Sequence, residues 1–503
     1  MEQDTIWPIM IFVKQKDHVH MHVEASDEGI TKEISDFFTF EVPGASFMPS
    51  YRNRHWDGKI RLYNLSRREL YVGLLPYLLE FAKQLEYEVK LEMGEIGEDM
   101  SREEVSEFAK RLKLHSNWKP IQIRDYQEDA VYDAINGGRT LLLSPTASGK
   151  SLIIYNLARY HHALGRKQLI VVPTTSLVEQ MYGDFADYST HNGFDVSKYC
   201  HRIYGGKEKT NKADIVISTW QSIYKYPKKW FEGFDVVYGD EAHLFKAKSL
   251  MTLMDKCTNA RFRIGTTGTL DGTKTHRLVL EGVFGKVYKV TSTKKLMDKK
   301  ELADLKIVCM LIEYPDEERK LVSKMPYKEE MDFIVGHAGR NNIISKLTVA
   351  QKGNTLLLYQ YVEKHGQKLY DIISKMTDRP VHFVYGGTET DQREKIRALT
   401  EKSDNTIIIA SYGTFSTGIN IRNLNNIVFA SPSKSRIRNL QSIGRGLRKS
   451  EIKTKCNLFD IGDDLSWKQR KNYTLNHLLE RIKMYNEEAF DYKVVKLDSQ
   501  GKI

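Results

Sequence analysis

The sequence predicts an α/β protein in which two tandem lobes with parallel sheets follow a small α+β domain. Beyond about residue 117, short β-branched runs alternate with longer helical segments, the pattern of a parallel sheet covered on both faces. An internal repeat predicts the two lobes, because an apolar run, a Tyr-Gly-Gly and a second apolar run occur twice in the same order. The repeated segments are residues 169–176, 204–206 and 215–219, and then residues 355–360, 385–387 and 407–411. A chain of 503 residues is long enough for three or four domains.

The first domain is expected to span residues 1–98. Apolar and polar residues alternate at 19–23 and at 87–91, which indicates strands, and the apolar spacing of residues 74–85 indicates a helix. Strands and a helix mixed in this way predict a small α+β domain.

A linker helix is expected next, over residues 99–117. Ser101 and Glu104 have the spacing of a capping box, and apolar residues then recur on one helical face. The remaining boundaries are expected as follows: a first lobe over 118–292, a second lobe over 293–455, and a C-terminal helical tail over 456–503.

Composition narrows the possible partners and compartments. The formal net charge is +11 and the isoelectric point is near 9.1, which favours a polyanionic partner. The four cysteines form no CxxC pair, so neither a zinc site nor a disulfide framework is indicated. No apolar run approaches about 18 residues and the amino terminus is acidic, so no membrane span or signal peptide is indicated. A cytoplasmic protein without membrane partners is expected.

A phosphate-binding loop is predicted between a strand at 139–144 and a helix at 152–164. In this context the backbone N–H groups at the helix start can surround phosphates. Lys150 is expected to reach the β- and γ-phosphates, and the Ser151 hydroxyl is expected to ligate Mg²⁺. Ser144 stands where the strict pattern has its first glycine. The predicted loop comprises Ser144, Pro145, Thr146, Ala147, Ser148, Gly149, Lys150 and Ser151.

An acidic pair follows another predicted strand. Asp240 is expected to hold the metal through water, and Glu241 to orient or deprotonate the attacking water. The alternative is an acidic turn that merely ends a strand. His243 suits two roles equally, a relay between nucleotide and partner or a filler of the lobe interface.

Arginines supply the positive charge that a loose phosphoryl-transfer transition state needs. Arg445 and Arg448 lie three residues apart, so on a helix both point the same way and can act as arginine fingers. Gln441, one turn earlier, is expected to contact the nucleotide or the partner lobe. A solvated arginine-rich surface is the alternative.

Taken together, these motifs resemble those of superfamily 2 helicases and translocases, in the same order and over residues 120–450. The resemblance implies two RecA-like lobes, ATP hydrolysis, and ATP and Mg²⁺ as cofactors. Arg124 and Gln127 resemble the adenine-sensing glutamine motif, and Gly418 and Asn420 fall in a segment that resembles motif V, so all four are implied nucleotide contacts. The other matching segments are 173–180 for motif Ia, 218–219 for motif Ib and 267–269 for motif III.

Within the superfamily, the signatures of DEAD-box RNA helicases are missing. The closer likeness is to the branch with XPB, type III restriction motors and phage recombination helicases, partly because of residues 51–63. This resemblance implies remodelling of branched DNA: Holliday junction migration, fork regression, and R-loop or D-loop unwinding in recombination, repair and replication. Forked duplex and RNA–DNA hybrid are the implied partners, a monomer is the default, and a phage-encoded chain would act in its host's cytoplasm.

Two groups of residues are candidates for nucleic-acid contacts. Hydroxyl groups are expected to meet the phosphate backbone in the first lobe, and in the first domain Arg52 and Arg54 are expected to bind phosphate while Trp56 stacks a base. Trp56 also suits a core position, closing a hairpin at the following Asp-Gly. The hydroxyl group comprises Thr174, Thr175, Ser218 and Thr219.

Three alternatives stay open on the sequence. An ATP-dependent RNA helicase is possible because backbone contacts do not reveal which sugar they read. A motor subunit of a restriction-type complex would share the motifs, although no obvious nuclease cluster occurs in the terminal regions. A nucleic-acid-binding protein with a degenerate ATPase would lack one of the motif residues, and all of them are present.

Overall fold

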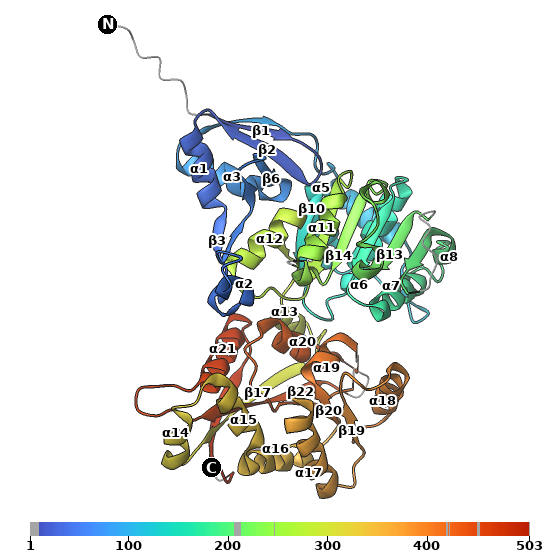
Figure 1. Cartoon of the computed structure of the whole chain (residues 1–503). Coiled ribbons are helices and arrows are strands. Elements are labelled where there is room, and N and C mark those ends of the chain that lie inside the picture. Colours follow the sequence, from blue (N-terminus) through green and yellow to red (C-terminus); the bar gives the residue numbers. More distant parts are fainter. Residues whose placement is uncertain are drawn as a thin grey trace. The chain divides into compact units, whose positions relative to one another are not determined.

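The computed structural model describes residues 10–205, 213–245, 247–418, 421, 423–449 and 453–501. The chain forms two compact units (Figure 1). The first unit comprises residues 1–144 and 149–290, and the second comprises residues 145–148 and 291–503.

The first domain is an α+β domain built on a five-stranded mixed sheet in the order β5-β6-β2-β1-β7. Strand β1 pairs antiparallel with β2 and parallel with β7. Alternate residues Ile11, Val13, Met21 and Val23 are buried under the helices, as the period of a half-buried strand requires. The elements are β1 Met10–Gln15, β2 His20–Ala25, α1 Glu28–Phe37, β5 Tyr63–Asn64, β6 Glu69–Tyr71, η2 Val72–Leu74, α3 Leu75–Gln84 and β7 Glu88–Glu92.

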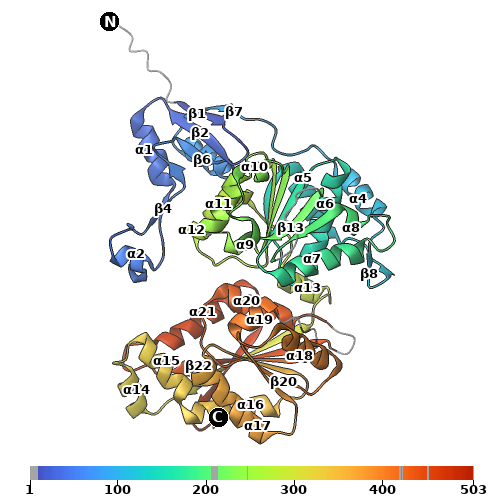
Figure 2. The same cartoon turned by 45° about the vertical axis from the view of Figure 1, so that its right-hand side comes forward.

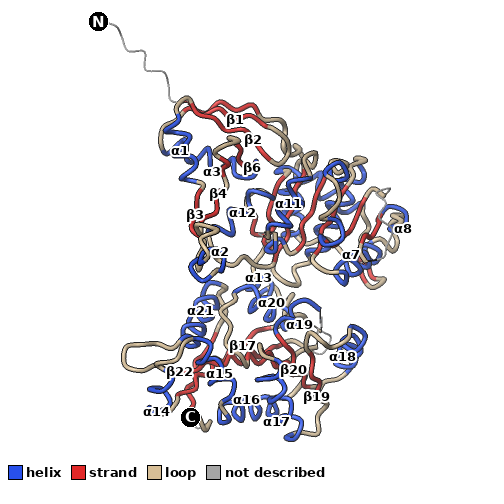
Figure 3. Tube along the Cα trace, viewed as in Figure 1, coloured by secondary structure: helices blue, strands red, loops and turns tan. Residues whose placement is uncertain are grey.

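An arm extends from this domain between α1 and β5 (Figures 2 and 3). Strands β3 (Thr39–Glu41) and β4 (Lys59–Arg61) pair antiparallel to form a two-stranded ribbon. Between them lie η1 (Ala45–Phe47) and α2 (Pro49–Arg52), which form the tip of the arm.

The first domain packs directly on the first lobe. Leu278 and Val279 of the lobe belong to the domain's own apolar core. The Tyr77 hydroxyl donates a hydrogen bond of 2.5 Å to the Glu281 carboxylate. A Cβ added at Gly73 would lie 2.0 Å from the Glu281 carbonyl oxygen, so only glycine permits this close approach of the two backbones. The domain and the lobe therefore form one compact unit.

Helix α4 (Arg102–Arg111) connects the domain to the lobe. The Ser101 hydroxyl accepts a hydrogen bond from the Glu104 N–H, and the Glu104 carboxylate accepts one from the Ser101 N–H, so the capping box is present. A short hairpin follows, with β8 (His115–Ser116) and β9 (Lys119–Pro120).

The first lobe is a seven-stranded parallel sheet in the order β12-β13-β11-β14-β15-β10-β16, with helices on both faces (Figure 1). Its central strands are buried along their whole length, as expected for a sheet covered on both sides. The strands are β10 Arg139–Leu143, β11 Gln168–Val172, β12 Cys200–Ile203, β13 Ile215–Thr219, β14 Val236–Asp240, β15 Phe262–Thr267 and β16 Val287–Lys289. The helices are α5 Asp125–Gly137, α6 Lys150–Ala163, α7 Thr175–Tyr188, α8 Val196–Tyr199, α9 Trp220–Ile223, α10 Lys228–Phe231, η3 Ala242–Leu244, α11 Lys248–Lys256 and α12 Lys274–Phe284.

The second lobe is another seven-stranded parallel sheet, in the order β19-β20-β18-β21-β22-β17-β23. The two lobes confirm the predicted tandem α/β architecture. The strands are β17 Asp304–Glu313, β18 Thr355–Tyr359, β19 Val381–Val384, β20 Ile407–Ser411, β21 Asn426–Phe429, β22 Lys455–Asp464 and β23 Tyr492–Asp498. The helices are α13 Thr293–Asp298, α14 Asp316–Val322, α15 Tyr327–Gly336, α16 Ala338–Ala350, η4 Val362–Gln367, α17 Lys368–Met376, α18 Thr390–Lys402, α19 Tyr412–Gly418, α20 Arg436–Gly446 and α21 Tyr473–Glu487.

The C-terminal segment is not a separate helical tail. Helix α21 is present, but β22 lies between β21 and β17 in the sheet and β23 lies at its edge. The sequence conceals β22 because Asp460 and Asp463 interrupt its apolar residues, although both are fully buried. Each carboxylate is paired, Asp460 with Arg481 and Asp463 with Arg340. Residues after 455 therefore complete the second lobe.

None of the described helices is long and apolar enough to cross a membrane. All four cysteines are buried thiols.

Candidate active site

The predicted phosphate loop lies between the end of β10 and the start of α6. The Ser144 N–H donates to the carbonyl oxygen of Thr267 at 2.8 Å, which fixes the beginning of the loop to β15. Gly149 has a φ of 84°, in the left-handed region that favours glycine. It has no side chain to cap α6, so the first-turn N–H groups can face an anion. The geometry suits a phosphate group at the start of α6.

Gln127 lies against this loop. It is buried, and its side-chain oxygen accepts a hydrogen bond of 3.0 Å from the Arg124 N–H at the start of α5. A Cβ added at Gly149 would lie 2.3 Å from the Gln127 Nε2 atom. The structure therefore brings the predicted adenine-sensing motif next to the predicted phosphate loop.

Ser151, the predicted metal ligand, contacts a residue that the sequence did not single out. Its hydroxyl lies 2.9 Å from the hydroxyl of Tyr188, at the end of α7. Burial raises the pKa of Tyr188, so the phenol stays protonated at neutral pH. If Ser151 donates its hydrogen to Tyr188, both lone pairs of the serine oxygen are available to a cation.

Asp240 is the last residue of β14 and is largely buried. The Thr266 hydroxyl on the neighbouring strand β15 donates to its carboxylate at 2.8 Å. Burial raises the pKa of Asp240 and the charge of Glu241 raises it further, whereas the charge of Lys150 and the hydrogen bond from Thr266 lower it. The net shift is upward, so a nearby cation would stabilise the charged form.

Glu241 has a φ of 50°, which is uncommon and strained for a residue other than glycine. Its carboxylate lies 3.3 Å from the Nδ1 atom of His243. That nitrogen is also 3.1 Å from the Thr267 hydroxyl. His243 thus connects the acidic pair to the Thr267-Gly-Thr269 segment within one lobe.

The oxygen donors near the predicted phosphate loop suit Mg²⁺ better than they suit a metal ion that is held entirely by protein side chains. Among the residues that the structure describes, no group of three or more His, Cys, Asp or Glu side chains could hold a metal. Magnesium usually takes one or two protein oxygens and completes its shell with water and substrate phosphates. Ser151 and Asp240, the residues predicted to hold the metal, carry a hydroxyl and a carboxylate of this kind.

The predicted arginine motif lies in the second lobe, where α20 carries Gln441 and Arg445. The Arg445 guanidinium carbon lies 5.5 Å from the centre of the Phe415 ring. Helix α20 ends at Gly446, so Arg448 lies beyond the helix, contrary to the expectation that both arginines share it. The helix ends in a tightened turn, in which the Arg448 N–H donates to the Arg445 carbonyl oxygen three residues earlier.

The predicted motif V is only partly described. Gly418 ends α19, and Asn420 lies outside the residues that the structure describes.

The four predicted hydroxyl contacts differ in exposure. Thr175 is exposed at the start of α7, and Thr174 is half-buried and caps that helix, accepting from the Leu177 N–H. Thr219 is buried. Ser218 is fully buried and its hydroxyl donates to the Ile203 carbonyl oxygen at 2.7 Å. Thr174 and Thr175 are therefore accessible to a nucleic acid, whereas Ser218 faces the interior of the sheet.

The arm carries a hollow of about 680 Å³. Trp56 is half-buried there, and its indole N–H donates to the Lys59 carbonyl oxygen at 2.8 Å. The indole closes the Asp57-Gly58 turn, but Trp56 is not among the buried residues of the domain core, so the core interpretation is wrong. The hollow is lined by Ser46, Tyr51, Arg52, Arg54, His55, Trp56 and Asp57.

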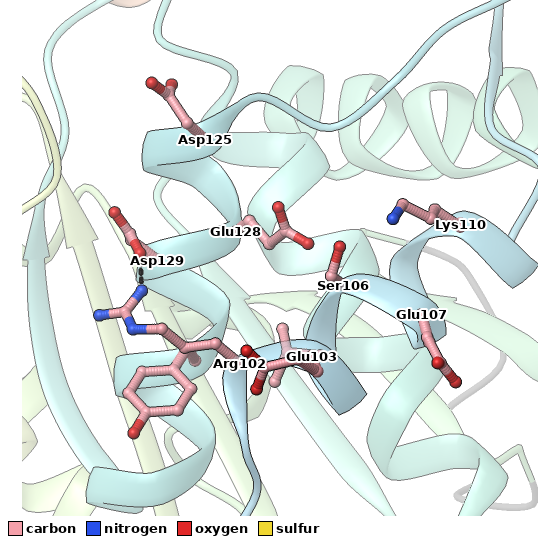
Figure 4. Close-up of a pocket in the computed structure, with 10 residues that line it drawn as sticks. Arg102, Glu103, Ser106, Glu107, Lys110, Asp125, Glu128 and Asp129 are labelled. Carbon is pink, nitrogen blue, oxygen red and sulfur yellow. Dashed lines mark hydrogen bonds and ion pairs between the residues drawn. The ribbon is translucent and has the colours of Figure 1, made fainter.

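A second hollow of about 450 Å³ lies between α4 and α5 (Figure 4). Arg102 lies over the Tyr132 ring and forms an ion pair with Asp129. Carboxylates outnumber basic groups in its lining, so the charge does not suit a triphosphate or a DNA backbone. The charged lining residues are Arg102, Glu103, Glu107, Lys110, Asp125, Glu128 and Asp129.

Sequence reasoning missed two residues that support the site, Thr266 and Tyr188. Thr266 directly precedes the segment that resembles motif III, so its position near the end of a strand could have indicated a place beside Asp240. Tyr188 carries no motif, and only the structure brings the end of α7 to Ser151.

Comparisons with known proteins agree with this geometry. The chain is 36% identical over 496 residues to the ATP-dependent DNA helicase UvsW of Enterobacteria phage T4, which covers 95% of this chain and 97% of that protein. The chain belongs to the UvsW family of helicases. Three family models also match: "DNA helicase UvsW, N-terminal" at residues 10–92, "Type III restriction enzyme, res subunit" at 120–272, and "Helicase conserved C-terminal domain" at 339–450.

Solved structures support the same assignment. The crystal structure of T4 UvsW matches with a TM-score of 0.51 at 32% identity, over 97% of this chain and 99% of that chain. A putative HsdR subunit of a type I restriction enzyme from Vibrio vulnificus matches with a TM-score of 0.57 at 17% identity, over 79% and 72% of the two chains. At that identity the second match shows the fold alone. The predicted superfamily 2, ATP-dependent DNA helicase with RecA-like lobes is confirmed.

Proposed function

We propose that this UvsW-family helicase uses ATP hydrolysis to remodel branched DNA, by Holliday junction migration, fork regression, and R-loop or D-loop unwinding. The observation that carries this proposal is the arm, where arginine and aromatic side chains line one hollow. Arginines bind phosphate without reading sequence, and a tryptophan face can stack any base. Recombination, repair and replication are the processes that such an activity serves. The enzyme acts as a monomer in the cytoplasm, which for a phage-encoded chain is that of the host.

The ATP site is proposed to lie at the start of α6. Residues 144–151 surround the phosphates, Arg124 and Gln127 contact the adenine, and Gly418 and Asn420 contribute from the second lobe. Close placement of Gln127 and Gly149 supports the first two assignments. The Lys150 ammonium group is the counter-charge for the phosphates.

Hydrolysis is proposed to depend on the acidic pair and the arginine motif. When bound by Ser151 and Asp240, Mg²⁺ would neutralise charge on the phosphates. Thr266 orients the Asp240 carboxylate, and Glu241 orients or deprotonates the attacking water. Arg445 and Arg448 stabilise the transition-state charge, and Gln441 contacts the nucleotide.

DNA is proposed to bind through its backbone. Thr174 and Thr175 at the start of α7 contact phosphate, with Thr219 on the adjoining strand, whereas the buried Ser218 does not. Arg52, Arg54 and Trp56 contact the branched part. Of the lobe residues, the accessible hydroxyls of Thr174 and Thr175 are the better supported.

The test is steady-state ATPase activity of the wild type and of Glu241→Gln, with no nucleic acid, single-stranded DNA, unbranched duplex DNA, forked DNA or RNA of matched length. Stimulation that is strongest with forked DNA and lost in the variant supports the proposal. Stimulation by RNA alone, or equal stimulation by forked and unbranched duplex, would overturn it.

A further inference from the structure

Three apolar side chains lie exposed at the tip of the arm. Phe47 is 76% exposed, the highest value for a large apolar residue in the described part of the first domain. Met48 and Tyr51 are each 41% exposed and lie within five residues of it. Single exposed apolar residues need no explanation, but three on one short projection mark an interaction site.

Backbone contacts hold this tip in shape. The Ala45 N–H donates to Val42, the Phe47 N–H to Gly44, and the Met48 N–H to Ala45, at 2.9 to 3.0 Å. Because most of the Phe47 side chain is exposed, its burial contributes little to the fold of the tip, and the backbone contacts present it to solvent.

The tip is also packed back onto its own ribbon. Gly58 has a φ of 80°, and a Cβ at this position would lie 3.0 Å from the Tyr51 ring and 3.1 Å from the Ala45 Cβ atom. Because the ring and the turn are this close, α2 and η1 rest on the start of β4.

The base of the arm is tied to the first lobe. The Thr275 hydroxyl donates to the Glu41 carbonyl oxygen at 3.5 Å, and the Lys274 ammonium group lies 5.6 Å from the centre of the Phe40 ring. Both lobe residues are in the first turn of α12, shortly after the segment that resembles motif III. The base of the arm therefore contacts the lobe that carries the predicted nucleotide site.

Basic side chains flank the apolar tip. Arg52 and Arg54 are exposed next to it, and Lys59 is exposed at the start of β4. The one acidic residue in the hollow, Asp57, forms an ion pair with Arg61. An apolar tip with cationic flanks is complementary to stacked bases between two phosphate backbones, and a DNA duplex is the occupant that this charge favours.

We propose that Phe47 and Met48 form an apolar wedge that inserts between base pairs at the branch point, while Arg52 and Arg54 hold the flanking phosphates. The inference rests on the proposed action on branched DNA. Proteins commonly insert Phe or Met side chains between base steps, and the cost is unstacking. At a branch point a base pair has already lost a neighbour on one side, so that cost is lowest there.

The experiment compares the double variant Phe47→Ala/Met48→Ala with wild type in two assays. The first is unwinding of a forked duplex and of a four-way junction, measured as base pairs opened per ATP hydrolysed. The second is the fluorescence of 2-aminopurine placed at the branch point, which rises when the base is unstacked. Phe12→Ala is the matched control, because Phe12 is 42% exposed on β1 of the same domain.

The double variant is expected to unwind about 10- to 100-fold less per ATP, the range that loss of base stacking gives. Its ATPase stimulation by single-stranded DNA is expected to match wild type, and its 2-aminopurine signal is expected to fall. Phe47→Trp is expected to retain unwinding, and the control to behave as wild type. Since the side chains are exposed, thermal unfolding is expected not to change.

The wedge would be overturned if the double variant opened as many base pairs per ATP as wild type and the 2-aminopurine fluorescence at the branch point did not change. The wedge would also be overturned if the wild type self-associated in gel filtration, and the double variant lost this self-association but unwound DNA as well as wild type. The tip would then bind a second copy of the chain. Absence of forked-DNA stimulation in the wild type would instead remove the proposed function itself.

Discussion

Substitution of Arg481 by Met tests whether the last strands and helix belong to the second lobe. Arg481 lies on α21 and is 2% exposed. Its guanidinium donates to both oxygens of Asp460, at 3.0 and 2.8 Å, and to the carbonyl oxygens of Ser433 and Ile461, at 2.9 and 3.2 Å. The variant would leave the Asp460 charge buried with one remaining side-chain donor, Tyr485 at 2.7 Å.

Loss of one partner from a buried ion pair costs about 3 to 5 kcal/mol. For a folding unit of this size, each kcal/mol shifts the midpoint by about 2 to 4 °C, so the second unit is expected to unfold about 6 to 20 °C lower. Differential scanning calorimetry on the full chain separates this transition from that of the first unit. Ser433 precedes α20, so ATPase activity is expected to be lost over the same lower temperature range.

Two further variants separate charge from packing. Lys496→Met removes an exposed ion pair with Glu313 and is expected to leave the unfolding temperature of the second unit nearly unchanged, because water screens such a pair. Arg481→Met/Asp460→Asn buries no net charge and is expected to recover most of the lost stability, because an uncharged pair avoids the desolvation cost. A shift below about 2 °C for Arg481→Met alone would contradict this account of the C-terminal segment.

Three other substitutions address the nucleotide site. Thr266→Val removes the hydroxyl that orients Asp240 and is expected to lower kcat/KM for ATP about 10- to 100-fold, while Thr266→Ser stays near wild type; equal rates for the two would exclude an orienting role. Gly149→Ala places a Cβ atom on a left-handed backbone and against the Gln127 side chain. ATP binding, measured by fluorescent-nucleotide titration, is therefore expected to be lost, and normal affinity would refute the loop geometry. Arg445→Ala is expected to slow hydrolysis about 10³- to 10⁵-fold with no change in Tm, and wild-type turnover would remove Arg445 from the mechanism.

The sequence predicts the lobes well because their strands are buried on both faces. Runs such as 169–172 and 407–410 are continuously apolar, and only a covered parallel sheet explains such runs at this spacing. The place of the loop between β10 and α6 is also predictable from the sequence, since Gly149 stands where the backbone is left-handed and favours glycine.

Prediction from the sequence fails where polar residues are buried. Asp460 and Asp463 read as surface residues, yet each is compensated by an arginine that is distant in sequence. Ser218 reads as a surface hydroxyl, yet it satisfies a carbonyl oxygen inside the sheet. No local pattern reports a partner from another element, so burial of polar groups requires the tertiary structure.

The order of strands in the second lobe also has a consequence for synthesis of the chain. Strand β17 is the first strand of this lobe to be synthesised, but both of its neighbours in the sheet, β22 and β23, come from the final part of the sequence. Until the ribosome has delivered them, both edges of β17 lack partners, and an apolar strand with open edges invites intermolecular pairing. A chain that stops before β22 is therefore expected to aggregate rather than to persist as a partly active motor.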